Sequence, residues 1–218
     1  MNYFFLAVFL ISSVIHLYAS LRQNKKLRAQ TKGFILPGLL GWYCCISDTP
    51  SNIIIAAILF SWLGDVLLIP KGVKWFTAGG ISFMVSHFCF VMAYRANIRF
   101  ETVPLWIIAA ASAVYLTAAV LVFRGLKEHL PKALFYPMFV YLLINGTMNC
   151  FALFQLISVP CLASAITFAG ATQFFISDSS LFYVRFKKDG RLKTHFLVML
   201  TYIIAEFLIV WGLSMLTV

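Results

Sequence analysis

The stretch "NIIIAAILFSWLGDVLLIP", residues 52–70, decides the fold class, because it is apolar over almost its whole length. A helix that crosses a lipid bilayer needs roughly 20 such residues. One carboxylate, Asp65, interrupts the run. An ionisable side chain at membrane depth is costly and usually marks a functional site. The stretch therefore predicts a membrane helix that carries part of such a site.

The composition extends this prediction to the whole chain. Hydrophobic residues make up 62% of the 218 positions and charged residues only 11%, whereas a soluble domain carries about 25% charged residues. The net charge of +10 does not indicate a nucleic-acid partner, because the basic residues lie in short stretches between apolar runs. We expect one domain over residues 1–218, a multi-pass protein of the cell membrane whose partner is the lipid bilayer.

Eight apolar segments follow one another along the chain. Each is predicted to be a helix, because lipid allows only helices or closed barrels and the alternation of barrel strands is absent. The first segment lacks the basic start of a signal peptide and is expected to be a retained helix. The segments cover approximately residues 2–20, 33–46, 52–70, 75–94, 102–123, 132–153, 160–184 and 195–217.

The second segment, "GFILPGLLGWYCCI" (33–46), is short and contains proline and glycine, so a re-entrant piece is an alternative. If it spans, all but Arg95 and Arg99 of the 17 basic residues fall on one side, which the positive-inside rule favours. If it does not span, they divide almost evenly. We therefore predict an all-α bundle of eight transmembrane helices with both termini on the non-cytoplasmic face. The inner residues are Arg22, Lys25, Lys26, Arg28, Lys32, Lys71, Lys74, Arg124, Lys127, Lys132, Arg185, Lys187, Lys188, Arg191 and Lys193.

Four ionisable residues stand out at membrane depth in the predicted spans: Asp65, His87, Asp178 and Glu206. The helix rise puts Asp65 ~7 Å and Asp178 ~9 Å from the inner ends of their helices, with His87 and Glu206 near mid-membrane. Because these groups cannot all face lipid, we expect them to converge on an internal cavity. The polar residues expected beside them are Asn145, Asn149, Gln173, Ser177 and Tyr202.

Asp65 and Asp178 are the predicted catalytic residues. Two carboxylates close together in a low dielectric do not both ionise readily, so one is expected to act as acid and the other as base, in either order. His87 is expected to hydrogen-bond one of them or to position water. A structural alternative is that single polar side chains merely join neighbouring helices. The expected substrate-binding or supporting residues are His87, Asn145, Ser177, Tyr202 and Glu206.

Four sequence blocks carry a resemblance to a known family. They are "FSWLGDVLLIP" (60–70), "FTAGGISFMVSHFCFVMAY" (76–94), "AGATQFFISDSSLFY" (169–183) and "TYIIAEFLIVWG" (201–212). In order and spacing they resemble the signature blocks of the YhhN-type lysoplasmalogenases. The resemblance implies an eight-helix membrane hydrolase that cleaves the vinyl ether bond of lysoplasmalogens, a class of lysophospholipid. The products would be a fatty aldehyde and glycerophospho-ethanolamine or -choline.

The resemblance assigns the functional roles to Asp65 of the LGD motif, Asp178 of the SD motif, and His87. The chain departs from the family pattern at Phe90, where Tyr is frequent, and at Glu206, where Gln is frequent. Vinyl ethers hydrolyse through protonation at carbon, which gives an oxocarbenium ion. A carboxylic acid in an apolar site can deliver that proton and a carboxylate can stabilise the cation. We therefore expect neither a metal nor a cofactor.

Other functions fit some of these features. Intramembrane acids also mark the pathway of a small proton-coupled transporter, although the halves of the chain show no convincing repeat. A lipid-binding membrane protein is a second alternative. A metal-dependent hydrolase is a third, and it would need histidines such as His16 and His195 to meet Asp65 near the inner face.

Overall fold

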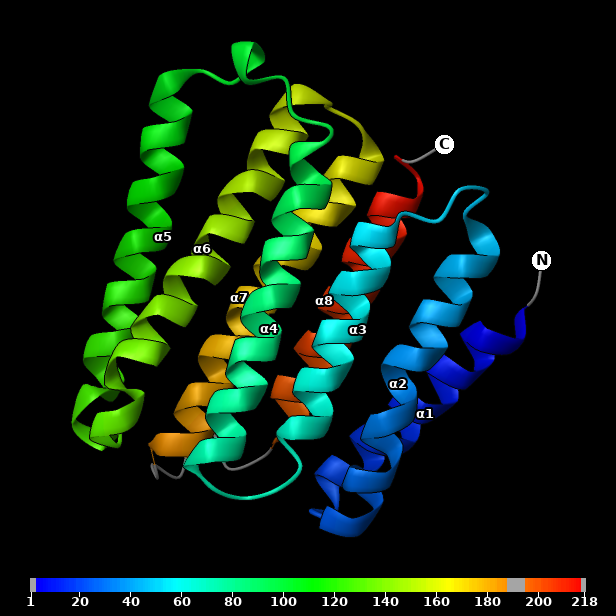
Figure 1. Cartoon of the computed structure of the whole chain (residues 1–218), viewed down its shortest axis with the longest axis vertical. Coiled ribbons are helices and arrows are strands. Elements are labelled where there is room, and N and C mark those ends of the chain that lie inside the picture. Colours follow the sequence, from blue (N-terminus) through cyan, green and yellow to red (C-terminus); the bar gives the residue numbers. More distant parts are fainter. Residues whose placement is uncertain (1–2, 188–194, 217–218) are drawn as a thin grey trace.

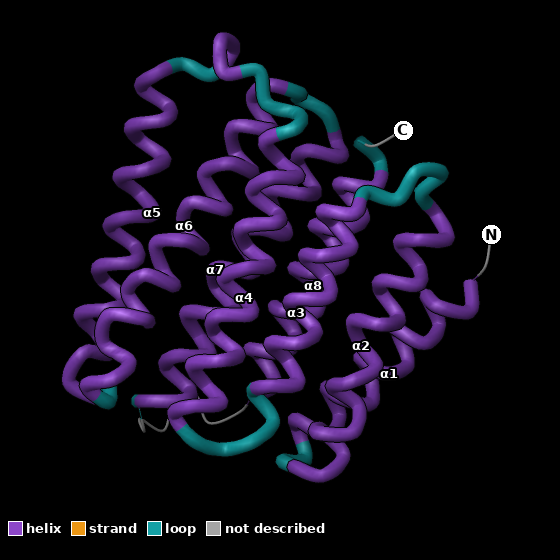
Figure 2. The backbone as a smooth tube through the Cα atoms, viewed as in Figure 1, coloured by secondary structure: helices purple, strands orange, loops and turns teal. Residues whose placement is uncertain are grey.

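Across the residues that the structure describes, the protein is a bundle of eight α-helices. The computed structural model describes residues 3–187 and 195–216, and within these ranges it contains helices and loops but no strand (Figure 2). The predicted all-α membrane bundle is thus confirmed. The helices are α1 (Tyr3–Leu21), α2 (Lys25–Ile46), α3 (Asn52–Leu67), α4 (Val73–Arg95), α5 (Leu105–Leu126), α6 (Phe135–Ser158), α7 (Leu162–Phe186) and α8 (His195–Ser214), with single turns η1 (Phe100–Thr102), η2 (Lys127–His129) and η3 (Lys132–Leu134).

Successive helices run in opposite directions (Figure 1). The loops that follow α2, α4 and α6 lie at one end of the bundle, and the turns that follow α1, α3 and α5 lie at the other. We call the second end the basic end. Its described basic residues are Arg22, Lys25, Lys26, Arg28, Lys32, Lys71, Lys74, Arg124, Lys127, Lys132, Arg185 and Lys187. Lys188, Arg191 and Lys193 lie outside the described residues. That the basic end faces the cytoplasm stays a prediction.

Five of the described helical segments are long and apolar enough to cross a membrane: those that contain α1, α4, α5, α6 and α8. The apolar helix α3 is shorter, with 16 residues. In the segment Leu105–His129 only 11% of the most apolar window is buried inside the protein. Because α5 lies at the edge of the bundle (Figure 1), its apolar surface is available to lipid.

Helix α2 is continuous, so the re-entrant alternative for residues 33–46 is wrong. It begins at Lys25, eight residues earlier than predicted, because the Asn24 side chain caps it by accepting a hydrogen bond from the Leu27 N–H. Pro37 lies inside the helix and has no N–H for the carbonyl of Gly33. The Trp62 Nε1–H donates to that carbonyl at 3.0 Å instead. A side chain from α3 thus satisfies the backbone group that proline leaves free in a bilayer.

The inner end of α3 also differs from the prediction. The helix ends at Leu67 and not near Pro70, because proline disfavours helical backbone in the preceding residue. Measured along their helices, Asp65 therefore lies ~3 Å and Asp178 ~12 Å from the helix ends, which differs from the expected ~7 Å and ~9 Å.

Helices α7 and α8 pack closely against each other. A Cβ atom at Gly170 would lie 2.8 Å from the backbone nitrogen of Ile209 and 2.9 Å from the carbonyl oxygen of Ala205. Small residues at membrane helix interfaces permit this close backbone approach. The pair presents Asp178 toward α6 and α4, and Tyr202 toward α3.

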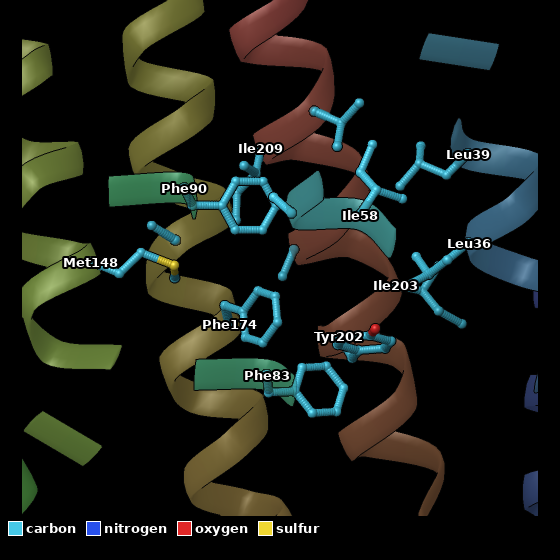
Figure 3. Packing of buried hydrophobic residues seen from close by; sticks show 14 of the residues in the cluster. Leu36, Leu39, Ile58, Phe83, Phe90, Met148, Phe174, Tyr202, Ile203 and Ile209 are labelled. Atoms are coloured by element: carbon cyan, nitrogen blue, oxygen red, sulfur yellow. The ribbon is translucent and has the colours of Figure 1, made fainter. Parts of the chain in front are cut away.

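Buried aromatic and aliphatic side chains fill the centre of the bundle (Figure 3). Phe83 of α4, Phe174 of α7 and Tyr202 of α8 pack edge to face, with ring centroids 5.5–6.3 Å apart. Such aromatic contacts favour one fixed geometry. They hold the Tyr202 ring, and with it the hydroxyl that reaches the site described next.

Candidate functional site

A cavity of about 290 Å³ opens at the basic end of the bundle. Side chains from α1, α2, α3, α4, α7 and α8 line it, so it forms only when these helices assemble. Asp65 and Asp178, which are far apart in sequence, both lie in its wall. The structure thus brings the two predicted catalytic carboxylates to one cavity, each with its own set of partners.

Asp65 has a donor on each carboxylate oxygen. The Lys32 ammonium lies 3.0 Å from Oδ1, and the Tyr202 hydroxyl donates to Oδ2 at 2.9 Å. The Asp65 side chain is 3% exposed and that of Lys32 is 15% exposed. An ion pair with this little solvent needs full hydrogen bonding to offset desolvation. The cation and the hydroxyl thus favour the carboxylate form of Asp65, against the desolvation that burial imposes.

Asp178 has neutral donors, and both contact the same oxygen. The Tyr141 hydroxyl donates to Oδ2 at 2.5 Å and the Asn145 side-chain amide donates to Oδ2 at 2.8 Å. Among the described residues, nothing hydrogen-bonds to Oδ1, and this oxygen is not sealed from the cavity. One oxygen of Asp178 is thus fixed by α6 and the other is open to a ligand.

His87 lies beside Asp178 but does not form the expected hydrogen bond. Its Nε2 is 3.7 Å from Oδ2 of Asp178, and neither ring nitrogen has a hydrogen-bond partner among the described residues. The ring packs edge to face on Tyr141 and Phe174, with centroids 5.4 and 4.8 Å away. In this arrangement, His87 orients the tyrosine that donates to Asp178.

The other predicted polar residues divide into two groups. Asn145 contacts Asp178, and Asn149 donates to the Asn145 carbonyl at 3.0 Å one turn away. Ser177 lines the cavity, but its hydroxyl donates to the Val198 carbonyl at 2.9 Å and so joins α7 to α8. Gln173 does not line the cavity. The expectation that all of these side chains converge on it is thus only partly met.

Glu206 is completely buried and lies outside the cavity wall. Ser61 and Tyr202 bring hydroxyls near its carboxyl group. Even so, neither carboxyl oxygen has a partner at hydrogen-bonding geometry among the described residues. Glu206 is therefore near the site without lining the cavity, a position that fits the supporting role expected of it and not the substrate-binding one.

The cavity wall changes character around Asp178. Its outer part carries five basic side chains, and a small apolar recess shares the wall formed by Leu68, Phe76, Phe83, Asp178 and Leu181. The recess extends to Tyr141 and Phe182. Asp178 thus lies at the boundary between charged and apolar surfaces. The basic residues of the outer part are Lys25, Arg28, Lys32, Lys71 and Arg185.

Histidines also line the cavity. His16 and His195 lie in its wall with Asp65, as the metal-dependent alternative requires. However, His16 Nδ1 is engaged with the Thr31 hydroxyl at 2.9 Å. Within the ranges 3–187 and 195–216, no three His, Cys, Asp or Glu side chains are grouped to hold a metal ion.

Two contacts of the site do not follow from the sequence pattern described above. Lys32 is expected in an inner loop, whereas it lies in α2 and binds Asp65. Tyr141 was not selected, although its spacing to Asn145 and Asn149 puts all three on one helix face. That spacing is sufficient to identify Tyr141 as a candidate from the sequence. No local pattern distinguishes Lys32 from the other lysines of the basic end.

Comparison with known proteins supports one family. No curated protein and no solved structure matches the chain significantly. The model of the YhhN family matches residues 27–213, which include α3 to α7 entirely and most of α2 and α8. The matched region contains Asp65, His87 and Asp178, the residues on which the resemblance of the sequence blocks rested. The chain belongs to the YhhN family.

Proposed function

We propose that this protein is a membrane hydrolase that cleaves the vinyl ether bond of lysoplasmalogens. The products are a fatty aldehyde and glycerophospho-ethanolamine or -choline. The proposal rests on family membership and on one observation: Asp178 lies where a charged cavity meets an apolar recess. In a lysoplasmalogen the vinyl ether lies where the polar headgroup meets the hydrocarbon chain. The reacting bond and the acid would therefore coincide.

The partner sets suggest which carboxyl group is the acid. Lys32 and Tyr202 occupy both oxygens of Asp65 and favour the ionised form. Asp178 receives only neutral donors, both on Oδ2, so a proton can reside on Oδ1 facing the cavity. We assign Asp178 as general acid and Asp65 as the carboxylate that stabilises positive charge.

With these roles, the proposed hydrolysis needs water as its only co-reactant. Asp178 Oδ1 gives its proton to the alkene carbon remote from the ether oxygen, and the alkene electron pair forms the new C–H bond. The oxocarbenium ion is stabilised by the Asp65 carboxylate, as in glycoside hydrolysis. Water adds to the cation and loses a proton to Asp178, which restores the acid. The hemiacetal collapses to aldehyde and alcohol.

The test is aldehyde release from lysoplasmenylethanolamine by the purified full-length chain. We expect Asp178→Asn and Asp65→Asn each to lower kcat by about 10²- to 10⁴-fold, the usual size of an acid–base contribution. Asp48→Asn, an exposed loop substitution of the same kind, is the matched control and should keep full activity. Activity should also persist in EDTA.

Each other outcome has a clear meaning. A folded parent protein that releases no aldehyde would overturn the proposal in favour of a transporter or a lipid-binding protein. Loss of activity in EDTA would point to the histidines as metal ligands. Full activity in both Asp variants would remove the carboxylates from the mechanism.

A further inference from the structure

The basic side chains around the cavity mouth form a second feature that the hydrolytic chemistry does not use. Five of them line the cavity, against two carboxylates. Lys32 is paired with Asp65, whereas no described carboxylate lies within ion-pairing distance of Arg28, Lys71 or Arg185. The mouth therefore carries an excess of positive charge that the described part of the protein does not neutralise.

Arg28 is the most informative member of this group. It lies on α2 one turn before Lys32 and is half-buried. Its Nε–H is enclosed, yet it has no hydrogen-bond partner among the described residues. An enclosed donor without an acceptor is costly, and the cost disappears when a ligand supplies the acceptor. A charged acceptor gives the stronger bond.

The basic groups also come together in space. Arg28 and Lys32 from α2 and Arg185 from α7 all act electrostatically on the His195 ring at the start of α8. Arg185 is held over the Phe76 ring, with its guanidinium carbon 5.5 Å from the ring centroid. Lys71, in the loop after α3, lines the same mouth. Guanidinium groups from two helices thus flank the mouth, an arrangement suited to a phosphate group.

We infer that Arg28, Lys71 and Arg185 form a phosphate-binding subsite that holds the headgroup of a phospholipid with its ether bond at Asp178. This inference rests on the proposed function for the identity of the lipid. It adds which side chains bind the phosphate, and it predicts that a neutral alkenylglycerol lacking that group binds poorly. Binding energy gained at the phosphate would then position the vinyl ether at the acid.

The test measures binding and does not require hydrolysis. The probe is a 1-O-alkyl lysophosphatidylethanolamine, whose saturated ether cannot react, titrated into the purified full-length chain. The comparison ligand is the matching 1-O-alkylglycerol, which lacks the phosphate. We expect the phospholipid to bind at least about 10-fold more tightly, the size of one charge-assisted contact.

Arg28→Gln and Arg185→Gln should each weaken binding of the phospholipid about 10-fold and leave binding of the alkylglycerol unchanged. Lys74→Gln, which removes the same charge from the same end but outside the cavity wall, should change neither. Thermal melting of each variant checks that it is folded. Equal affinity of the parent protein for both lipids would overturn the subsite, and so would equal losses in Lys74→Gln and Arg28→Gln.

Inorganic phosphate is the remaining ligand to compare, as a competitor of the lipid probe. Displacement of the lipid probe by inorganic phosphate at the probe's own affinity would assign the subsite to a free anion and overturn the headgroup assignment. Because the probe is not hydrolysed, a protein that binds it as expected but releases no aldehyde would contradict the proposed hydrolase and leave the subsite intact. An active enzyme that binds both lipids equally well would contradict the phosphate subsite and leave the proposed hydrolase intact.

Discussion

The ammonium of Lys32 lies 3.0 Å from Oδ1 of Asp65, which joins the first polar turns of α2 to the last turn of α3 inside the cavity. Asp65 is buried and its other oxygen accepts from Tyr202. Removal of the cation would leave a buried carboxylate with one donor. The pair therefore connects helix packing with the state of the proposed catalytic carboxylate.

Lys32→Met should reduce both stability and aldehyde release. Breaking a buried pair by removing one partner typically costs about 3–5 kcal/mol, and loss of the ionised Asp65 should lower kcat about 100-fold or more. Thermal unfolding and steady-state kinetics in detergent measure the two effects. The double variant Lys32→Met/Asp65→Asn should recover most of the stability but not the activity. Lys26→Met, exposed on the same helix, is the control; unchanged stability in Lys32→Met would contradict a structural ion pair.

Tyr141→Phe removes one of the two donors to Asp178 and keeps the ring that packs on His87 and Phe182. We expect kcat for aldehyde release to fall about 10-fold, because a hydrogen bond to an ionisable group contributes about 1.5–3 kcal/mol. Tyr136→Phe on the same helix alters a 79% exposed side chain and should have no effect. Equal kcat in Tyr141→Phe and the parent would mean that this hydroxyl does not support the acid.

Glu206→Gln should be tolerated. The side chain is buried, lies outside the cavity wall, and has no hydrogen-bond partner among the described residues. An amide of the same shape removes the cost of a buried carboxyl group, so stability should stay equal or rise by about 1 kcal/mol. Activity should stay within about threefold, since the residue does not line the cavity. A loss comparable to that of Asp178→Asn would place Glu206 in the catalytic machinery.

Gly170→Ala should destabilise the bundle by about 1–3 kcal/mol, because the added carbon would overlap backbone atoms of Ala205 and Ile209 and push α7 from α8. Gly80→Ala is the matched control within a helix. Nothing lies within 4 Å of its added carbon, so we expect a neutral to slightly stabilising effect. Melting temperatures compare the two variants. Equal melting temperatures would mean that α7 and α8 can move apart without loss of stability.

Much of the site could be predicted from residue types alone. An acid within an apolar run stands out, because lipid excludes unpartnered charge, and this reasoning selected Asp65, Asp178 and Glu206. It could not distinguish the carboxyl groups that line the cavity from the one that does not. That distinction depends on which helix face meets which neighbour. The distance of Asp65 from the inner end of its helix also differs from the expected one, since α3 ends three residues early.

By itself, the sequence determined the all-helical membrane class and the number of helices, because apolar length and the distribution of basic residues act locally along the chain. Only the tertiary structure decided which side chains contact one another in the site and between the helices. Lys32 pairs with Asp65, Tyr141 donates to Asp178, and Trp62 donates to the carbonyl that Pro37 leaves free. Each of these contacts joins residues on different helices. Their formation depends on how close-packed helices rotate and cross, which no local pattern of residues specifies.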